Sequence, residues 1–237
     1  MPSLALDRQG TKKETLYAFC DFLGTRRCES IEFVCSDMWR AYITVIGERF
    51  SNAVHVLDRF HIVGHLNKAV DNVRRAEVKK LKDSGQPAYL KKCRWIFLKK
   101  KSRVWGKPRA RLRELLDLNL RTVKAYLFKE DFDHLWTYTS VTWANKFMNE
   151  WTKDVMRHRS LPELKKFAKM IRRHQELILN YFRAKKEFSS GIVEGFNNKA
   201  KLTIRKSYGF RSDKLREIAL YHTLGNLPVP EITHRFV

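Results

Sequence analysis

The sequence lacks the features that identify several classes of protein. No stretch approaches the roughly 18 apolar residues of a membrane-spanning helix, and residues 1–19 contain no apolar core of an export signal. The four cysteines form no C-x-x-C pair and have no matching histidine pair, so we expect neither a structural zinc site nor a disulfide framework. Phosphate-binding loops, G-x-S-x-G and Rossmann glycine patterns are missing too. These absences predict a cytoplasmic protein with reduced thiols and no membrane partner.

Acidic residues are also scarce. The 237 residues include 48 Lys and Arg against 25 Asp and Glu, which gives a formal charge of +23 and a pI near 10.1. Such an excess attracts polyanions, so nucleic acid is the expected partner. The chain is 43% hydrophobic and contains 15 Phe and 6 Trp, enough to bury a core. One large domain, or one domain with an insertion, fits these numbers best.

Two strand-then-helix units are predicted in the first third of the chain. Residues 30–37 form an apolar, β-branched run that breaks at an aspartate and leads into a helix over 38–50. A second short strand ends at Leu57, before a long helix in which Phe60, Val63, Leu66 and Val70 recur at helical spacing. Two such units predict a partly parallel sheet.

Beyond residue 77 the sequence becomes strongly basic. Residues 79–129 contain 17 Lys and Arg against three acids, mixed with aromatics, which favours nucleic-acid contact over a merely solvated surface. From 112 to 186 the apolar spacing stays helical, and we expect a helical insertion. Its large aromatics are expected in the core rather than as stacking platforms for bases: Trp136, Trp143, Phe147 and Trp151.

Two carboxylates stand out as candidate site residues. Asp37 follows a predicted strand, at the edge where ligands gather in open α/β sheets, although an aspartate there can equally cap a helix. Glu194 lies among glycines, amides and cations. If residues 191–206 are helical, a polar face carries Glu194, Asn197, Asn198, Lys201 and Arg205, and the buried side receives Ile192, Phe196, Leu202 and Ile204. A simple Glu-to-Lys surface ladder explains neither the paired asparagines nor the flanking glycines, so we favour a site.

Three ordered segments resemble the ISL3-type group of DDE transposases of bacterial insertion sequences. They are VCSDMWRAYITVI, AVHVLDRFHIVGHLNKAVDNVRRAE and SSGIVEGFNNKAKLTIRKSYGFRS, and the resemblance covers nearly the whole chain. It implies an α/β, RNase H-like core interrupted by a large, all-helical basic insertion before the last acidic residue. It also implies DNA strand cleavage and transfer at insertion-sequence ends by phosphoryl transfer with two metal ions.

The resemblance assigns roles to individual residues. Asp37 matches the second acid of an Asp-Asp-Glu triad and Glu194 the third, and both would bind two Mg²⁺ or Mn²⁺ ions. Hard carboxylate oxygens suit these ions, which activate the attacking oxygen and stabilise the leaving one. The neighbouring amides and cations would hold the DNA backbone: Asn197, Asn198, Lys199, Lys201, Arg205, Lys206 and Arg211.

A second element of the family follows the next strand. The segment DRFH resembles an Asp/Cys-x-x-His element, so Asp58 and His61 would support the site or position a DNA strand without binding the metal directly. His61 and His65 also form HIVGH, which suggests zinc. The segment lacks the glutamate of H-E-x-x-H, which argues against that interpretation.

The first acid of the triad has no match. Asp7 and Asp21 are the only earlier aspartates, and we expect them in a link and in the first helix, neither being the family's position. We therefore expect a truncated transposase, inactive alone, whose core lacks its first strands. The expected division is a partial RNase H-like core at 1–75, a basic helical insertion at 76–186, and core helices with the third acid at 187–237.

Two other functions remain open, and so does the question of whether the chain is an enzyme. A non-catalytic DNA-binding protein could inhibit an intact transposase by competing for DNA or by mixed assembly. An RNase H-like nuclease would share the metal chemistry but predicts no long basic insertion. The sequence leaves the oligomeric state open, a homo-oligomer included.

Overall fold

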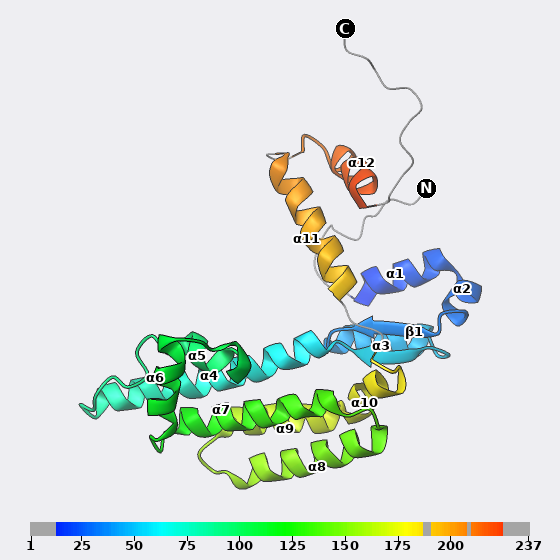
Figure 1. Ribbon diagram of the computed structural model, residues 1–237. Coiled ribbons are helices and arrows are strands. Elements are labelled where there is room, and N and C mark those ends of the chain that lie inside the picture. Colours follow the sequence, from blue (N-terminus) through cyan, green and yellow to red (C-terminus); the bar gives the residue numbers. More distant parts are fainter. Residues whose placement is uncertain (1–12, 187–190, 208–209, 225–237) are drawn as a thin grey trace.

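The computed structural model describes residues 13–186, 191–207 and 210–224, which form mostly helices and a small sheet (Figure 1). Within these residues no helix is both long enough and apolar enough to cross a membrane.

The sheet consists of two parallel strands. Strand β1 (Phe33–Ser36) pairs with β2 (Val54–Leu57) in register, Phe33 opposite Val54 and Ser36 opposite Leu57. Helix α3 (Arg40–Arg49) forms the connection between them. Both predicted strands and both following helices are confirmed, as is the parallel pairing, because the β-branched runs and the helical spacing that follows them were clear local signals.

One side of the sheet is covered by the amino-terminal helices. Helices α1 (Lys13–Leu23) and α2 (Thr25–Glu29) pack with α3 around a small hydrophobic cluster. Val34 of β1 packs against this cluster. Its buried members are Cys20, Cys28, Val45, Ile46 and Phe50.

Helix α4 (Arg59–Asp83) begins two residues after β2 and runs away from the sheet into the helical part (Figure 1). Of the apolar residues that recur at helical spacing, Leu66 and Val70 are buried, whereas Phe60 is 65% exposed. Ile62, not Phe60, begins the buried stripe, because a helix buries only the side that faces its neighbours. Those neighbours are α7 (Arg121–Phe132) and α9 (Pro162–Arg173).

The remaining elements of this part are the long helix α8 (Val141–Arg157), which packs against α9, and several shorter helices. They confirm the helical character expected over 112–186. The shorter helices are α5 (Arg94–Leu98), η2 (Lys101–Arg103), α6 (Lys107–Leu116), η3 (Asp133–Thr137) and α10 (Gln175–Arg183).

Aromatic side chains fill the core between these helices. Trp136 and Trp151 are buried, and Phe132 makes edge-on ring contacts to both at 6.1 and 4.8 Å between centroids. Phe147 is half-buried against the same core. The expectation for Trp143 is wrong: it is 57% exposed, with the Lys146 ammonium 5.2 Å from its ring centre.

Helix α10 returns the chain to the sheet. It packs on β2, where the Asn180 side-chain amide donates to the His55 carbonyl oxygen at 2.8 Å. A single hydrophobic cluster therefore includes both β2 and the helices up to α10. Helix α4 is continuous through the expected boundary at 75/76, so the division into core and insertion stays a prediction. Helices α11 (Gly191–Lys206) and α12 (Asp213–Leu224) pack on each other.

A buried carboxylate joins α4 to α7. Helix α7 has no side-chain cap of its own; instead Glu77 of α4 accepts hydrogen bonds from the Arg121 and Thr122 backbone N–H groups at 2.8 and 2.7 Å. The guanidinium of Arg121 lies 3.6 Å from the same carboxylate. Glu77 thus satisfies the helix donors that local sequence leaves unpaired.

We expect Glu77→Ala to lower the free energy of unfolding by about 3 kcal/mol, because it removes charge-assisted hydrogen bonds and leaves buried donors unpaired. Urea unfolding followed by circular dichroism measures the change. The matched control is Glu150→Ala on the exposed side of α8, for which we expect a change within about 0.5 kcal/mol. Equal effects of the two substitutions would contradict the capping role of Glu77.

Candidate functional site

Two aspartates follow the carboxyl ends of the paired strands. Asp37 comes directly after β1 and Asp58 directly after β2, and the Asp58 N–H donates to the Ser36 carbonyl at 2.8 Å. Because the strands are parallel and in register, both residues lie at the same edge of the sheet. The sequence prediction placed Asp37 after a strand, and the structure adds that Asp58 is its neighbour.

Asp37 is half-buried and holds a local turn. One carboxylate oxygen accepts a hydrogen bond from the Trp39 N–H at 2.9 Å, just before α3. No lysine or arginine among the described residues forms an ion pair with this carboxylate. Tyr42 lies near it: burial raises the pKa of Tyr42, and the charge of Asp37 raises it further. Asp37 therefore has polar neighbours but no neutralising cation in the part of the chain that the structure describes.

Asp58 has a different environment. It is 2% exposed and is the N-cap of α4, where it accepts from the Phe60 N–H at 3.1 Å. Its other oxygen lies 3.6 Å from Nε2 of His61, which is half exposed. Capping a long helix is a structural role in its own right. The contact between Asp58 and His61 also fixes the direction in which the His61 ring extends from the first turn of α4.

His65 lies one turn beyond His61 on α4. Burial lowers the pKa of His65, Lys68 and His61 lower it further, and Asp37 opposes them. His65 is therefore close enough to Asp37 to feel its charge. Among the described residues, no three His, Cys, Asp or Glu side chains form a group suited to a metal ion.

The predicted third acid is on a helix, as expected. Residues 191–206 form α11, but the side chains of Glu194 and Asn197, together with those of Ile192 and Phe196, lie outside the described residues. The remaining predicted DNA-binding residues are exposed: Asn198, Lys199, Lys201, Arg205, Lys206 and Arg211.

The expected buried side of α11 is only partly observed. Leu202 is exposed, contrary to expectation, while Ile204 is half-buried. The helical spacing marks an apolar side of α11 but does not say whether a neighbour covers it.

The structure describes one of the two earlier aspartates. Asp21 lies in α1, as expected, and pairs with Arg49 of α3 at 2.9 Å. Asp7 lies outside the described residues.

Sequence reasoning missed a buried polar pair beneath this edge. His55 of β2 is 8% exposed, and its Nε2 lies 2.8 Å from the Ser36 hydroxyl of β1. That hydroxyl also donates to the Asp37 carbonyl at 2.8 Å. Burial lowers the pKa of His55 to about 4, so the ring is neutral at pH 7. A histidine within the apolar run VHVL was the available signal.

The sequence of the chain is similar to those of known proteins. A family model described as transposase, of the ISL3-type DDE group, matches residues 5–216. The chain is 29% identical over 208 residues to the transposase for insertion sequence element IS1001 of Bordetella parapertussis, covering 86% of this chain and 50% of that protein. It is 26% identical over 245 residues to the transposase for IS1557 of Mycobacterium tuberculosis, covering 92% and 54%.

The chain thus spans about half the length of the curated relatives it matches. No solved structure shows significant similarity to it.

The neutral His55 makes stability depend on pH. Its folded pKa of about 4 lies below the ordinary value of 6.5, so only the unfolded chain takes up the proton as pH falls between these values. We expect acidification from pH 7 to 4.5 to cost the wild type about 2–3 kcal/mol more than His55→Gln. Urea unfolding of both proteins across this range measures the difference, and parallel pH profiles would show that His55 is not buried in its neutral form.

Proposed function

Because the chain belongs to the ISL3-type family of DDE transposases, we propose that it contributes to DNA strand cleavage and transfer at insertion-sequence ends. Such a protein would act on chromosomal DNA in the bacterial cytoplasm. The observation that carries the proposal is Asp37: a half-buried carboxylate at the carboxyl end of a strand, unpaired with any cation of the described chain although the protein carries a charge of +23.

The described sheet edge fits part of a divalent metal site. Asp37 offers a hard oxygen ligand that accepts one hydrogen bond from a backbone N–H, whereas Asp58 is occupied by capping α4 and by His61. We propose Asp37 and Glu194 as the residues that would hold Mg²⁺ or Mn²⁺. Two such ions, when bound, would supply activation of the attacking oxygen and stabilisation of the leaving one. Asp58 and His61 would position the first turn of α4 beside them.

The fold supports the proposal in outline. A parallel strand pair with helices on both sides, followed by a basic helical segment and a helix carrying Glu194, has the order of an RNase H-like core with an insertion. We propose that residues 76–186 form this insertion, whose buried residues share one hydrophobic core with β2. DNA would be held by exposed side chains of α11 and by Arg211, which follows the helix. The residues of α11 are Asn198, Lys199, Lys201, Arg205 and Lys206.

A second function is favoured by one observation. Since neither Asp7 nor Asp21 matches the position of the first acid of the triad, the 237-residue chain alone would bind DNA without cutting it. Such a chain could inhibit an intact transposase by competition for DNA or by mixed assembly. Mixed assembly would mean that this chain replaces one copy of the intact transposase in a homo-oligomer.

The test uses two proteins and one substrate. The 237-residue chain, with Mg²⁺ or Mn²⁺ and a duplex carrying an IS1001 end, should bind but neither nick nor join DNA. A chimera in which the preceding part of the IS1001 transposase is fused to this chain should cleave the same duplex and lose cleavage when the metal is chelated.

Within the chimera, Asp37→Asn and Glu194→Gln should each lower the cleavage rate at least about 1000-fold, because an amide keeps the shape but not the metal-binding charge. DNA affinity, measured by fluorescence anisotropy, should stay within about twofold, because it rests on cations. Asp21→Asn is the matched control and should leave cleavage unchanged. Full cleavage by Asp37→Asn would sink the assignment.

A further inference from the structure

Six residues of α4 share one side of the helix. They follow one another at alternating intervals of four and three, which keeps them within about 40° of a single line along the helix. The set contains cations, histidines and one amide, and no acid. Its members are His61, His65, Lys68, Asn72, Arg75 and Lys79, and we refer to them as the α4 stripe.

The stripe begins at the candidate site. His61 lies 3.6 Å from Asp58, and His65 is near enough to Asp37 for that charge to act on it. From there the stripe extends over 18 residues, or about 27 Å of helix, which is roughly the axial length of eight base pairs. All its members are exposed except Asn72, which is half-buried.

Two of the three acids of α4, Asp71 and Glu77, are buried, while Asp83 is exposed four residues beyond the end of the stripe. Asp71 is 6% exposed and binds three arginines: Arg74 at 2.7 Å, Arg75 at 3.1 Å and Arg94 of α5 at 3.5 Å. One buried carboxylate thus orders three guanidinium groups and leaves a net positive charge. Glu77 is buried at the start of α7.

The two lysines of the α4 stripe differ from Arg75 in their ion pairing. Neither Lys68 nor Lys79 has an ion pair with any described residue. The stripe itself contains no acid, although Asp71 and Glu163 line hollows beside it, so the balance of charge along it is positive.

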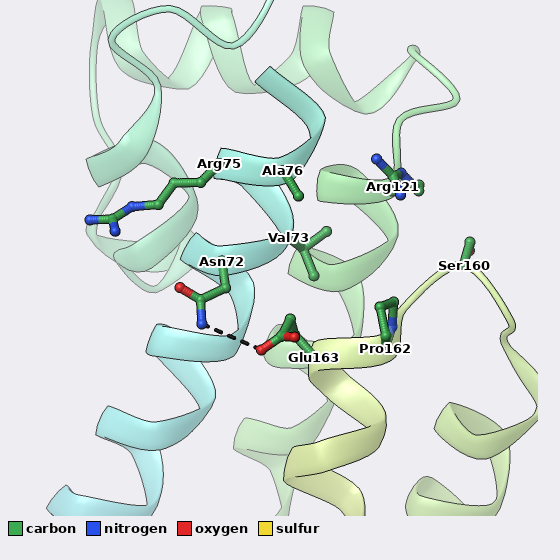
Figure 2. A pocket seen from close by; sticks show the side chains of 8 residues that line it. All are labelled: Asn72, Val73, Arg75, Ala76, Arg121, Ser160, Pro162 and Glu163. Atoms are coloured by element: carbon green, nitrogen blue, oxygen red, sulfur yellow. Dashed lines mark hydrogen bonds between the residues drawn. The ribbon is translucent and has the colours of Figure 1, made fainter. Parts of the chain in front are cut away.

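Three surface hollows lie along the stripe, and all three are lined by Asn72. Their volumes are about 220, 290 and 300 Å³. Figure 2 shows the largest, where Arg75 and Arg121 extend on opposite sides of α4 and Asn72 donates to Glu163 of α9 at 3.4 Å. The other two hollows add Lys166 of α9 and Arg94. Cations of three neighbouring helices therefore flank the stripe.

A glycine at the edge of the stripe supports a close approach by a partner. Gly64 is exposed in the second turn of α4 and, with Lys68 and Arg94, lines one of the three hollows. A Cβ atom built there would meet nothing within 4 Å, so packing within the chain does not require glycine. Glycine costs a helix roughly 0.5–1 kcal/mol relative to alanine. Its absent side chain instead leaves the helix backbone accessible.

We propose that the α4 stripe binds the phosphodiester backbone of duplex DNA and leads it to the sheet edge at Asp37. The proposal rests on the proposed function, because it assumes that DNA is the substrate. Lysines and arginines would neutralise phosphates, and Asn72 and the histidines would donate hydrogen bonds to phosphate oxygens. This surface is separate from the cations of α11.

The first test compares two double substitutions in the 237-residue chain by fluorescence anisotropy with duplex DNA over a series of salt concentrations. Lys68→Gln with Lys79→Gln should weaken binding roughly tenfold at low salt and reduce the slope of log affinity against log salt by about 1.8. The control, Lys146→Gln with Lys153→Gln on α8, removes the same charge from exposed lysines elsewhere and should change the slope by less than about 0.5.

The outcomes separate the two proposals. If the wild-type chain binds DNA and both double variants lose the same affinity, the stripe is wrong while the proposed function stands. If the wild type shows no salt-dependent DNA binding, the proposed function fails and the stripe fails with it. Lys68→Arg with Lys79→Arg should keep the wild-type slope, because arginine retains the charge.

The second test uses matched glycines. Gly64→Leu should weaken DNA binding at least about fivefold by blocking approach to the helix, and Gly47→Leu on α3 should leave it unchanged. Both glycines are exposed in helices and have open space where a side chain would start, so both variants should fold. Equal affinity of the two leucine variants would remove Gly64 and the surface beside it from the DNA path.

Discussion

The packing of α4 is the constraint on which the rest of the structure depends. The helix begins where β2 ends, and the buried Asp58 carboxylate fixes that beginning by capping its first turn. Ile62 and Leu66 start a buried stripe that continues into the core shared with α7 and α9. Because an α-helix is stiff and rises about 1.5 Å per residue, this one element sets the distance and direction of every exposed side chain from the sheet edge. A shift of the helix at Asp58 would therefore displace the whole α4 stripe.

The distribution of acids explains how so basic a chain folds. Asp71 and Glu77 are buried on α4, where one orders three arginines and the other caps α7. Asp133 likewise pairs with Lys100 at 2.7 Å and lies 3.9 Å from Arg59. These carboxylates stabilise internal contacts and leave many surface cations without partners. Charge repulsion among those cations is then relieved by a polyanion, which is a physical reason for DNA to bind.

The local signals in the sequence were strong where the structure confirms them. Residues 30–37 and the run ending at Leu57 became paired parallel strands, and residues 191–206 became one helix. Trp143 was expected in the core and is exposed, as is Phe60 on α4, because spacing marks an apolar side but not what covers it. For the candidate site, Asp37 was found from its position after a strand. His55 was missed because a histidine inside a strand has no periodic signal.

The sequence by itself determined the helices, the two strands, the excess of positive charge and the candidate acids, because each depends on residues close together in the chain or on composition alone. The family followed from three ordered segments and the matched residues. Only the tertiary structure decided that Asp58 is buried, that Asp37 has no cation beside it among the described residues, and that Glu77 caps a helix 44 residues away in the sequence. Those outcomes depend on which distant elements pack together, and on the cost of leaving a buried polar group without a partner.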